Sequence, residues 1–395
     1  MRLALLLLLV LAGCGARTRP LVEQERDATL PHPPPLDAGA DAGTDASVPP
    51  LPMGCTLGPR LGPYTSDAPA FAFSLSPLEG RRGYLVGYAL GWPPDERASL
   101  ATIDLGLASF EAQLGFDGDQ VAATSSASWI AAVSEHRGNR IDLSWIRADD
   151  SPWTIRTRTN VCAMCFGPFT SRGPVLDGSR GVIAYRTSDD VVVYAVPVGG
   201  GAPPSTRVFP DEAGPALVMA GGDLVLVTNT SDRSVSNLRY LEPDLSERAN
   251  VELPIVPVGG APGLLGRERD VLVVGRADDV GAMHLVRADE SGAGQQVPLD
   301  VEPGLYVGFS VARSRGVVAA TLEGTRRNYV VALRDDTLES IVDPIVFVDS
   351  ARGSSYRRPA TIAPHPDGFA LVYGSWEEEG LYALYGRILT CRGFD

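Results

Sequence analysis

A short, strongly apolar run of four or five residues recurs along most of this chain. The runs lie at 84–88, 129–133, 181–185, 223–227, 270–274, 316–320 and 368–372. The centres of the first and last runs, residues 86 and 370, are six intervals apart, which gives a mean spacing of about 47 residues. Because the runs are apolar without alternation, they are typical of strands that are buried on both faces.

Each run lies in a similar setting. A shorter apolar segment precedes it and often opens with proline, as at 68–73, 173–176, 214–219, 261–266 and 358–363. Proline is tolerated at the first position of a strand, where a missing N–H costs least. A polar hairpin tip follows the run, and then come a third, alternating strand and a weaker fourth. We therefore expect seven units of four short strands.

The length of the repeat indicates a fold class. Periods of about 40–50 residues with four strands each are typical of propeller blades, which bury their faces by stacking around an axis. The chain resembles a seven-bladed β-propeller over 54–395, without the G-H and W-D marks of the WD40 class and without a sharp kelch pattern. The resemblance implies an all-β domain of four-stranded antiparallel blades. The 43 Gly and 32 Pro residues agree, because they interrupt helices.

One segment fits two interpretations. Leu100, Ile103, Leu107, Phe110 and Leu114 have helical spacing, so 98–114 fits a helix. Gly106 lies in the middle of the pattern and weakens it, and the repeat requires two strands of the first unit here. We favour strands.

The N-terminus has the pattern of an export signal. An apolar segment follows Arg2, is too short to span a membrane, and ends in LAGC at 11–14. These residues resemble the lipobox of bacterial lipoproteins. The resemblance implies that 1–13 is a signal peptide and that Cys14 carries acyl chains such as palmitate, which hold the protein in the cell envelope. Gly15 favours the outer membrane over the inner one, since the family's inner-membrane proteins often have Asp there.

A linker separates this anchor from the repeats. Residues 14–53 show no apolar periodicity and include the Pro-rich stretch 31–35 and DAGADAGTDASVPP at 37–50. Such segments bury too little apolar surface to offset the entropy of ordering. We expect a flexible tether over 14–53, followed by the propeller over 54–395.

The four other cysteines suggest two disulfides, because exported chains with an even number of cysteines commonly pair them. Cys55 and Cys391 lie at the two ends of the repeat array, where a ring must close, and Cys162 and Cys165 form a local C-x-x-C. We favour 55–391 and 162–165, although three connectivities are open. Free thiols at 162 and 165 are a less favoured alternative. A redox dithiol or a zinc half-site is also less favoured, because no helix start and no second pair accompany the motif.

Charge narrows the range of partners. The formal net charge is −14, and all 34 basic residues are arginine. Such a surface disfavours nucleic acid, which needs basic patches. We expect contact with a membrane through the lipid anchor and no binding to nucleic acid.

The hairpin tips between second and third strands offer a candidate binding face, since in a propeller they share one end of the ring with the blade-to-blade connections. A ligand such as a cation, sugar or peptide could bind there, although hairpin tips are commonly polar and merely solvated. The candidate residues in these tips are Trp92, Glu135, His136, Asp189, Asp190, Asp232, Arg233, Asp278, Asp279, Arg326, Arg327, Trp376 and Glu377.

No motif identifies a reaction. The sequence has no G-x-S-x-G elbow, H-E-x-x-H pair or P-loop. His136, His284 and His365 are scattered, so we predict no metal site, no cofactor and no catalytic residue. We expect a lipid-anchored binding or scaffold protein that presents a propeller face to a protein or glycan. The alternative is an enzyme on the same scaffold, a hydrolase or a quinone-dependent dehydrogenase. A purely architectural envelope component is a third option.

Overall fold

The computed structural model describes residues 54–65, 70–79, 83–91, 97–107, 109–136, 140–162, 173–178, 180–198, 202–230, 232, 234–256, 263–277, 281–302, 306–324, 327–349, 360–376 and 382–394. The predicted signal peptide, Cys14 and the tether lie outside these residues. Within the described part of the chain, no helix has the length and apolarity needed to cross a bilayer.

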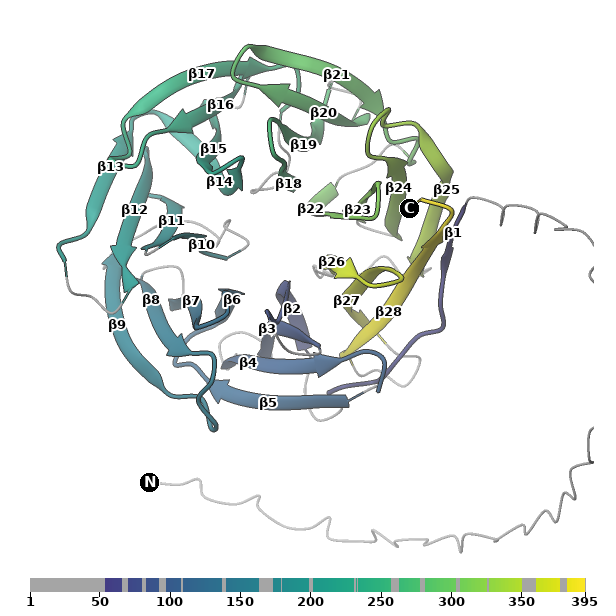
Figure 1. The fold of residues 1–395 in the computed structure, drawn as a ribbon, viewed down its shortest axis with the longest axis horizontal. Coiled ribbons are helices and arrows are strands. Elements are labelled where there is room, and N and C mark those ends of the chain that lie inside the picture. Colours follow the sequence, from purple (N-terminus) through teal and green to yellow (C-terminus); the bar gives the residue numbers. More distant parts are fainter. Residues whose placement is uncertain are drawn as a thin grey trace, which may run out of the picture. The chain divides into compact units, whose positions relative to one another are not determined.

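Seven antiparallel four-stranded sheets are arranged as blades around a central axis (Figure 1). From the axis outward, blade 1 has β2 (Ala70–Pro77), β3 (Tyr84–Leu90), β4 (Arg97–Asp104) and β5 (Ser109–Gly115). Blade 2 has β6 (Gln120–Ser125), β7 (Trp129–His136), β8 (Arg140–Arg147) and β9 (Ile155–Cys162). Blade 3 has β10 (Val175–Asp177), β11 (Arg180–Arg186), β12 (Val191–Pro197) and β13 (Ser205–Phe209).

The later blades repeat this order. Blade 4 has β14 (Glu212–Ala220), β15 (Asp223–Thr230), β16 (Ser236–Leu241) and β17 (Glu247–Leu253). Blade 5 has β18 (Gly263–Gly266), β19 (Val271–Arg276), β20 (Met283–Asp289) and β21 (Gly292–Pro298). Blade 6 has β22 (Tyr306–Ser314), β23 (Val317–Gly324), β24 (Arg327–Arg334) and β25 (Ser340–Asp349). Blade 7 has β26 (Ala360–His365), β27 (Gly368–Trp376), β28 (Tyr382–Arg392) and, outermost, β1 (Gly54–Leu57).

The all-β, seven-bladed prediction is confirmed. Each apolar run is the second strand of a blade, and these strands are buried along almost their whole length, as in β7 and β23. The ambiguous segment 98–114 forms β4 and β5, and Leu107 in the turn between them is 75% exposed. A helix would have buried Leu107 with its apolar neighbours. The segment forms strands instead, because blade 1 needs a third and a fourth strand, as every other blade has.

Proline opens the inner strand less uniformly than the sequence suggests. In blade 4 the strand begins at Glu212, and Pro215 lies inside it, where the register between β14 and β15 shifts between Ala213 and Ala216. A β-bulge leaves one residue unpaired, so the missing N–H of proline costs no ladder hydrogen bond there.

The two ends of the domain meet in blade 7. Strand β1 pairs antiparallel with β28, and Cys55 lies directly opposite Cys391. The two cysteines form a disulfide across a sequence separation of 336 residues, which confirms the predicted ring closure. Backbone hydrogen bonds continue the pairing from Gly58 N to Ile388 O at 2.8 Å and from Tyr64 N to Leu384 O at 2.9 Å. The ring is therefore closed by hydrogen bonds and by a covalent bond.

The second pair of cysteines is described in part. Cys162 ends β9 and is disulfide-bonded. Cys165 lies outside the described residues, so the local 162–165 pairing stays a prediction.

Neighbouring blades contact each other closely at their inner strands. The Ser74 hydroxyl of β2 accepts a hydrogen bond from the backbone N–H of Ala123 in β6 at 3.0 Å. The Ser310 hydroxyl of β22 accepts one from Ile362 N in β26 at 3.2 Å. Both serines are buried, and these bonds satisfy backbone donors that the inner edge of a blade would otherwise leave unpaired. The blades are thus joined by polar contacts as well as by apolar packing.

Candidate binding pocket between blades 4 and 5

The antiparallel strand order places the predicted hairpin tips at one end of the ring, which we call the loop face. Six candidate residues there lie outside the described part of the chain: Trp92, Arg233, Asp278, Asp279, Arg326 and Glu377. Trp376 ends β27, and its side chain is also outside the description. The described candidates are Glu135, His136, Asp189, Asp190, Asp232 and Arg327.

In blade 2 the loop face has a buried carboxylate. Asp142 of β8 is fully buried, and its oxygens lie 3.2 Å from His136 Nε2 and 2.8 Å from Arg140 Nη2. Asn160 Nδ2 donates to the same carboxylate at 3.1 Å. Glu135 beside His136 is 4% exposed. This cluster belongs to the interior of one blade, where paired polar partners offset the cost of burying the charge.

The other described candidates form hydrogen bonds or ion pairs within their own hairpin or with a neighbouring blade connection. The Asp190 carboxylate accepts a hydrogen bond from Asp211 N at 3.3 Å, and Arg327 pairs with Glu302 at 2.6 Å. Asp232 accepts hydrogen bonds from Ser234 N and from the hydroxyls of Thr230 and Ser234, which lower its pKa to about 2. Asp189 is exposed and accepts from the neighbouring Ser188 hydroxyl at 3.0 Å. None of these contacts joins candidates from two different tips.

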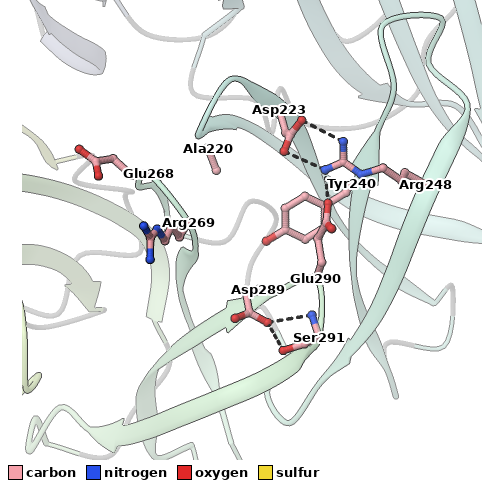
Figure 2. A pocket seen from close by; sticks show the side chains of 9 residues that line it. All are labelled: Ala220, Asp223, Tyr240, Arg248, Glu268, Arg269, Asp289, Glu290 and Ser291. Carbon is pink, nitrogen blue, oxygen red and sulfur yellow. Dashed lines mark hydrogen bonds and ion pairs between the residues drawn. The ribbon is translucent and has the colours of Figure 1, made fainter.

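A pocket of about 380 Å³ lies at the opposite end of the ring, which we call the turn face, between blades 4 and 5 (Figure 2). Each blade contributes residues from the ends of its strands and from its tight turns. From blade 4 these are Ala220, Asp223, Tyr240 and Arg248, and from blade 5 they are Glu268, Arg269, Asp289, Glu290 and Ser291. None of the described candidates predicted from the sequence lies on this face.

Arg248 joins the two blades at the pocket wall. Its guanidinium donates to both oxygens of Asp223 in blade 4, at 3.1 and 2.8 Å, and also to Glu290 in blade 5. The fork of arginine matches a carboxylate in this two-point geometry. These hydrogen bonds lower the pKa of Asp223 below its ordinary value of 3.8. The contact is therefore a salt bridge that spans the blade boundary.

The remaining wall combines a carboxylate with a phenol. Ser291 donates twice to Asp289 Oδ1, from its backbone N at 2.8 Å and from its hydroxyl at 2.5 Å, and these bonds lower the pKa of Asp289. The Tyr240 side chain is 3% exposed, and its hydroxyl has no hydrogen-bond partner. Burial, together with the nearby carboxylates, raises the pKa of Tyr240 to about 12. Figure 2 shows this hydroxyl pointing into the gap between Asp289 and Arg269.

The bridge at Asp223 predicts a pH dependence of stability. Because its pKa is lower in the folded state than in the unfolded state, its stabilising contribution is complete above pH 3.8 and is lost on further acidification. We expect Asp223→Asn to unfold at lower urea concentration than the wild type at pH 7, and the difference to shrink as the pH falls below 3.8. Asp189→Asn serves as a control on the loop face. If the urea midpoints of the wild type and Asp223→Asn differed as much in acid as at pH 7, the stabilising role of the ionised Asp223 would be contradicted.

The three histidines in the described part of the chain do not meet. His136 lies in blade 2, His284 in blade 5 and His365 in blade 7, and among the described residues no group of His, Cys, Asp and Glu could hold a metal ion. His284 Nδ1 is 2.9 Å from Gln296 Nε2, and the His365 ring stacks on Tyr84 at 6.4 Å between centroids. Both are accounted for by packing within the fold.

The pocket could have been noticed from charged turn sequences. RERD at 267–270 and ADES at 288–291 occupy tight turns of blade 5, where a hairpin needs only two or three residues. The sequence instead favours the longer tips, because they are polar and share one end of the ring with the blade-to-blade connections. The sequence does not show that turns from two blades lie side by side.

No protein-family model matches the chain, and no curated protein resembles it in sequence. Solved structures resemble it in fold. The WD40 domain of Toxoplasma gondii coronin is 12% identical with a TM-score of 0.54, and the match covers 88% of this chain and 89% of that one. Kluyveromyces lactis Hsv2 is 12% identical with a TM-score of 0.50, covering 81% and 99%.

A third structure shares the architecture. The β-propeller domain of the Trilobed protease from Pyrococcus furiosus is 9% identical with a TM-score of 0.50, and the match covers 84% of this chain and 97% of that one. That domain is described as having an open velcro topology, whereas here β1 completes blade 7 and is bonded to β28. At these identities the comparisons establish the propeller fold and nothing about activity.

Proposed function

We propose that this chain is a lipid-anchored binding or scaffold protein of the bacterial cell envelope, and that its propeller holds a protein or glycan partner. The observation that supports binding over catalysis is the constant protonation state of Asp223, Asp289 and Tyr240 in the pocket between blades 4 and 5. General acid–base catalysis needs a group whose pKa lies near the working pH. The pKa values of Asp223 and Asp289 are lowered, and that of Tyr240 is raised to about 12.

These groups therefore keep one protonation state at neutral pH. Asp223 and Asp289 remain anions, and Tyr240 remains a neutral phenol. Groups of constant charge at the mouth of a rigid cleft suit recognition of a complementary charge. They do not suit the repeated gain and loss of a proton.

The lipid anchor is proposed from the LAGC sequence at 11–14. We expect Cys14→Ser, expressed in a bacterium with a lipoprotein pathway, to move the protein from the membrane pellet to the soluble fraction. The wild type should carry added mass at its N-terminal cysteine in intact-mass measurements. A Cys14→Ser protein that stays in the pellet to the same extent would contradict the anchor.

The binding function is tested by capture from native membranes. The full chain is solubilised with its partners and recovered through a C-terminal tag, together with Asp289→Asn on the turn face and Asp189→Asn on the loop face. We expect one partner in near-stoichiometric amount with wild type and Asp189→Asn, and less of it with Asp289→Asn. If Asp189→Asn recovered less of the partner and Asp289→Asn recovered as much as the wild type, the binding surface would be the loop face predicted from the sequence.

The enzyme alternative gives a different result in the same preparation. Recovery of no partner, together with turnover in a screen of hydrolase and quinone-dependent dehydrogenase substrates, would overturn the binding proposal. Each variant is also checked by urea unfolding, so that a misfolded protein is not counted as one that fails to bind.

A further inference from the structure

We propose that the pocket between blades 4 and 5 binds an alkylammonium group, carried by a lysine side chain of a partner or by a free polyamine. This inference rests on the proposed binding function and adds the chemistry of the ligand. Three features of the pocket support it: an unpartnered buried hydroxyl, an excess of negative charge, and single acceptor atoms.

The hydroxyl of Tyr240 indicates a missing partner. It is buried and makes no hydrogen bond, and it points into the pocket rather than into the core (Figure 2). A buried hydroxyl without a partner destabilises a fold unless water or a ligand supplies the bond. A phenylalanine at this position would pack in the same way without an unpartnered hydroxyl. The presence of tyrosine at the pocket wall therefore favours a contact between its hydroxyl and a ligand.

The charge of the lining selects a cation. Four carboxylates and two guanidinium groups line the pocket. Arg248 is bonded to Asp223 and Glu290. The other charged groups of the lining are the carboxylates of Asp289 and Glu268 and the guanidinium of Arg269, so negative charge is in excess. The field of the carboxylates acts on the phenol oxygen, so a positively charged donor is stabilised beside it.

The geometry of the free acceptors favours an ammonium over a guanidinium. Near the Tyr240 hydroxyl, the carboxylate of Asp223 offers two parallel acceptors but already binds Arg248 through both oxygens, and Glu268 lies on the opposite side of the pocket (Figure 2). Asp289 receives both Ser291 bonds on Oδ1, and its other oxygen points away from Ser291 (Figure 2). A single carboxylate oxygen and a phenol oxygen suit the compact, freely rotating donors of an ammonium, whereas a guanidinium prefers a planar two-point contact.

The chain itself supplies no competing ammonium side chain, because all of its 34 basic residues are arginine. Any lysine bound in the pocket therefore comes from another molecule. This chemistry favours a basic protein segment over a neutral glycan among the partners proposed above.

Calorimetric titration of the full chain in detergent tests the ligand class. The probes are spermidine, an Nα-acetyl-lysine methylamide, and the same compound with its side-chain nitrogen acetylated. We expect at least one of the two amines to bind, and the neutral acetylated compound to bind at least about tenfold more weakly. Tighter binding of spermidine would identify a free polyamine, and tighter binding of the lysine compound would identify a partner's side chain.

Variants locate the site. We expect Tyr240→Phe and Asp289→Asn each to weaken binding of the amine at least about fivefold, and Asp189→Asn to leave its affinity unchanged. Arg269→Ala should strengthen binding, because it removes a like charge. The proposal would be overturned if Arg269→Ala bound the amine more weakly than the wild type does, or if the neutral compound bound as tightly as the amines. It would also be overturned if Asp189→Asn weakened amine binding as much as Asp289→Asn does.

The outcome also separates this inference from the function on which it rests. Since Tyr240→Phe keeps the ring and removes the unpartnered hydroxyl, it should unfold at the same urea concentration as the wild type or at a higher one. If neither amine binds but the membrane capture still recovers a partner, the ammonium chemistry is wrong and the binding function stands. If the amines bind and no partner is captured, the site is one for a free polyamine.

Discussion

Replacing Cys55 and Cys391 together by serine is expected to lower the free energy of unfolding by about 3–5 kcal/mol. The disulfide joins positions 336 residues apart, so it restricts almost the whole unfolded chain. In the chain-entropy model a loop of this length gives roughly 5–6 kcal/mol, which is an upper value because residual structure and strain reduce it. The folded ring should persist, because β1 stays hydrogen-bonded to β28. Urea unfolding followed by tryptophan fluorescence measures the change.

Cys162→Ala is the matched control for this experiment. If Cys162 pairs with Cys165, as the C-x-x-C spacing predicts, its bond closes a very short loop and gives only about 2 kcal/mol in the same model. The effect of the terminal pair should therefore be clearly larger. Equal losses from the two disulfides, or a loss below about 1 kcal/mol at the terminal pair, would contradict the role of the Cys55–Cys391 bond in closing the ring.

Gly266→Ala is expected to destabilise the protein by about 3 kcal/mol. Gly266 ends the inner strand of blade 5, and a Cβ atom there would lie 1.8 Å from the carbonyl oxygen of Met219 in blade 4. Since the obstructing atom belongs to the backbone of an inner strand, no side-chain rotation relieves the clash. The two blades must move apart, and the packing between them is lost.

A second glycine provides the comparison. Gly115 ends β5 on the outer edge of blade 1, and a Cβ atom there would meet nothing within 4 Å. Gly115→Ala should be neutral or stabilise by up to about 1 kcal/mol, because alanine reduces the entropy of the unfolded chain. Thermal unfolding of both variants measures the contrast. Similar midpoints for the two would show that blades 4 and 5 are not in the close contact described.

The repeat made most of the fold predictable. Apolar runs such as 84–88 and 368–372 need burial on both faces, and only regular stacking of small sheets provides that seven times. The disulfide followed from the same reasoning, because a closed ring brings Cys55 and Cys391 together. The position of β1 was not predicted. This four-residue strand, which includes Cys55, carries no periodic signal of its own, and only its pairing with β28 defines it.

The pocket was harder to predict for a related reason. Its residues come from turns of two blades that are far apart in the sequence, such as Asp223 and Asp289. Each turn alone resembles an ordinary polar hairpin. Their proximity depends on how closely blades 4 and 5 approach each other, which in turn depends on Gly266. On the loop face, Asp190 and Asp232 looked equally available, but their side chains form hydrogen bonds within their own blade or the connection beside it.

The most direct test of the whole account is zero-length crosslinking in native membranes. A carbodiimide joins a carboxylate to an amine, and because this chain has no lysine, it cannot join two copies through their side chains. Mass spectrometry of the products then locates the partner. The account predicts crosslinks from a partner's lysine to Glu268 or Asp289 on the turn face. Crosslinks confined to Asp189 and Asp190 on the loop face would contradict it.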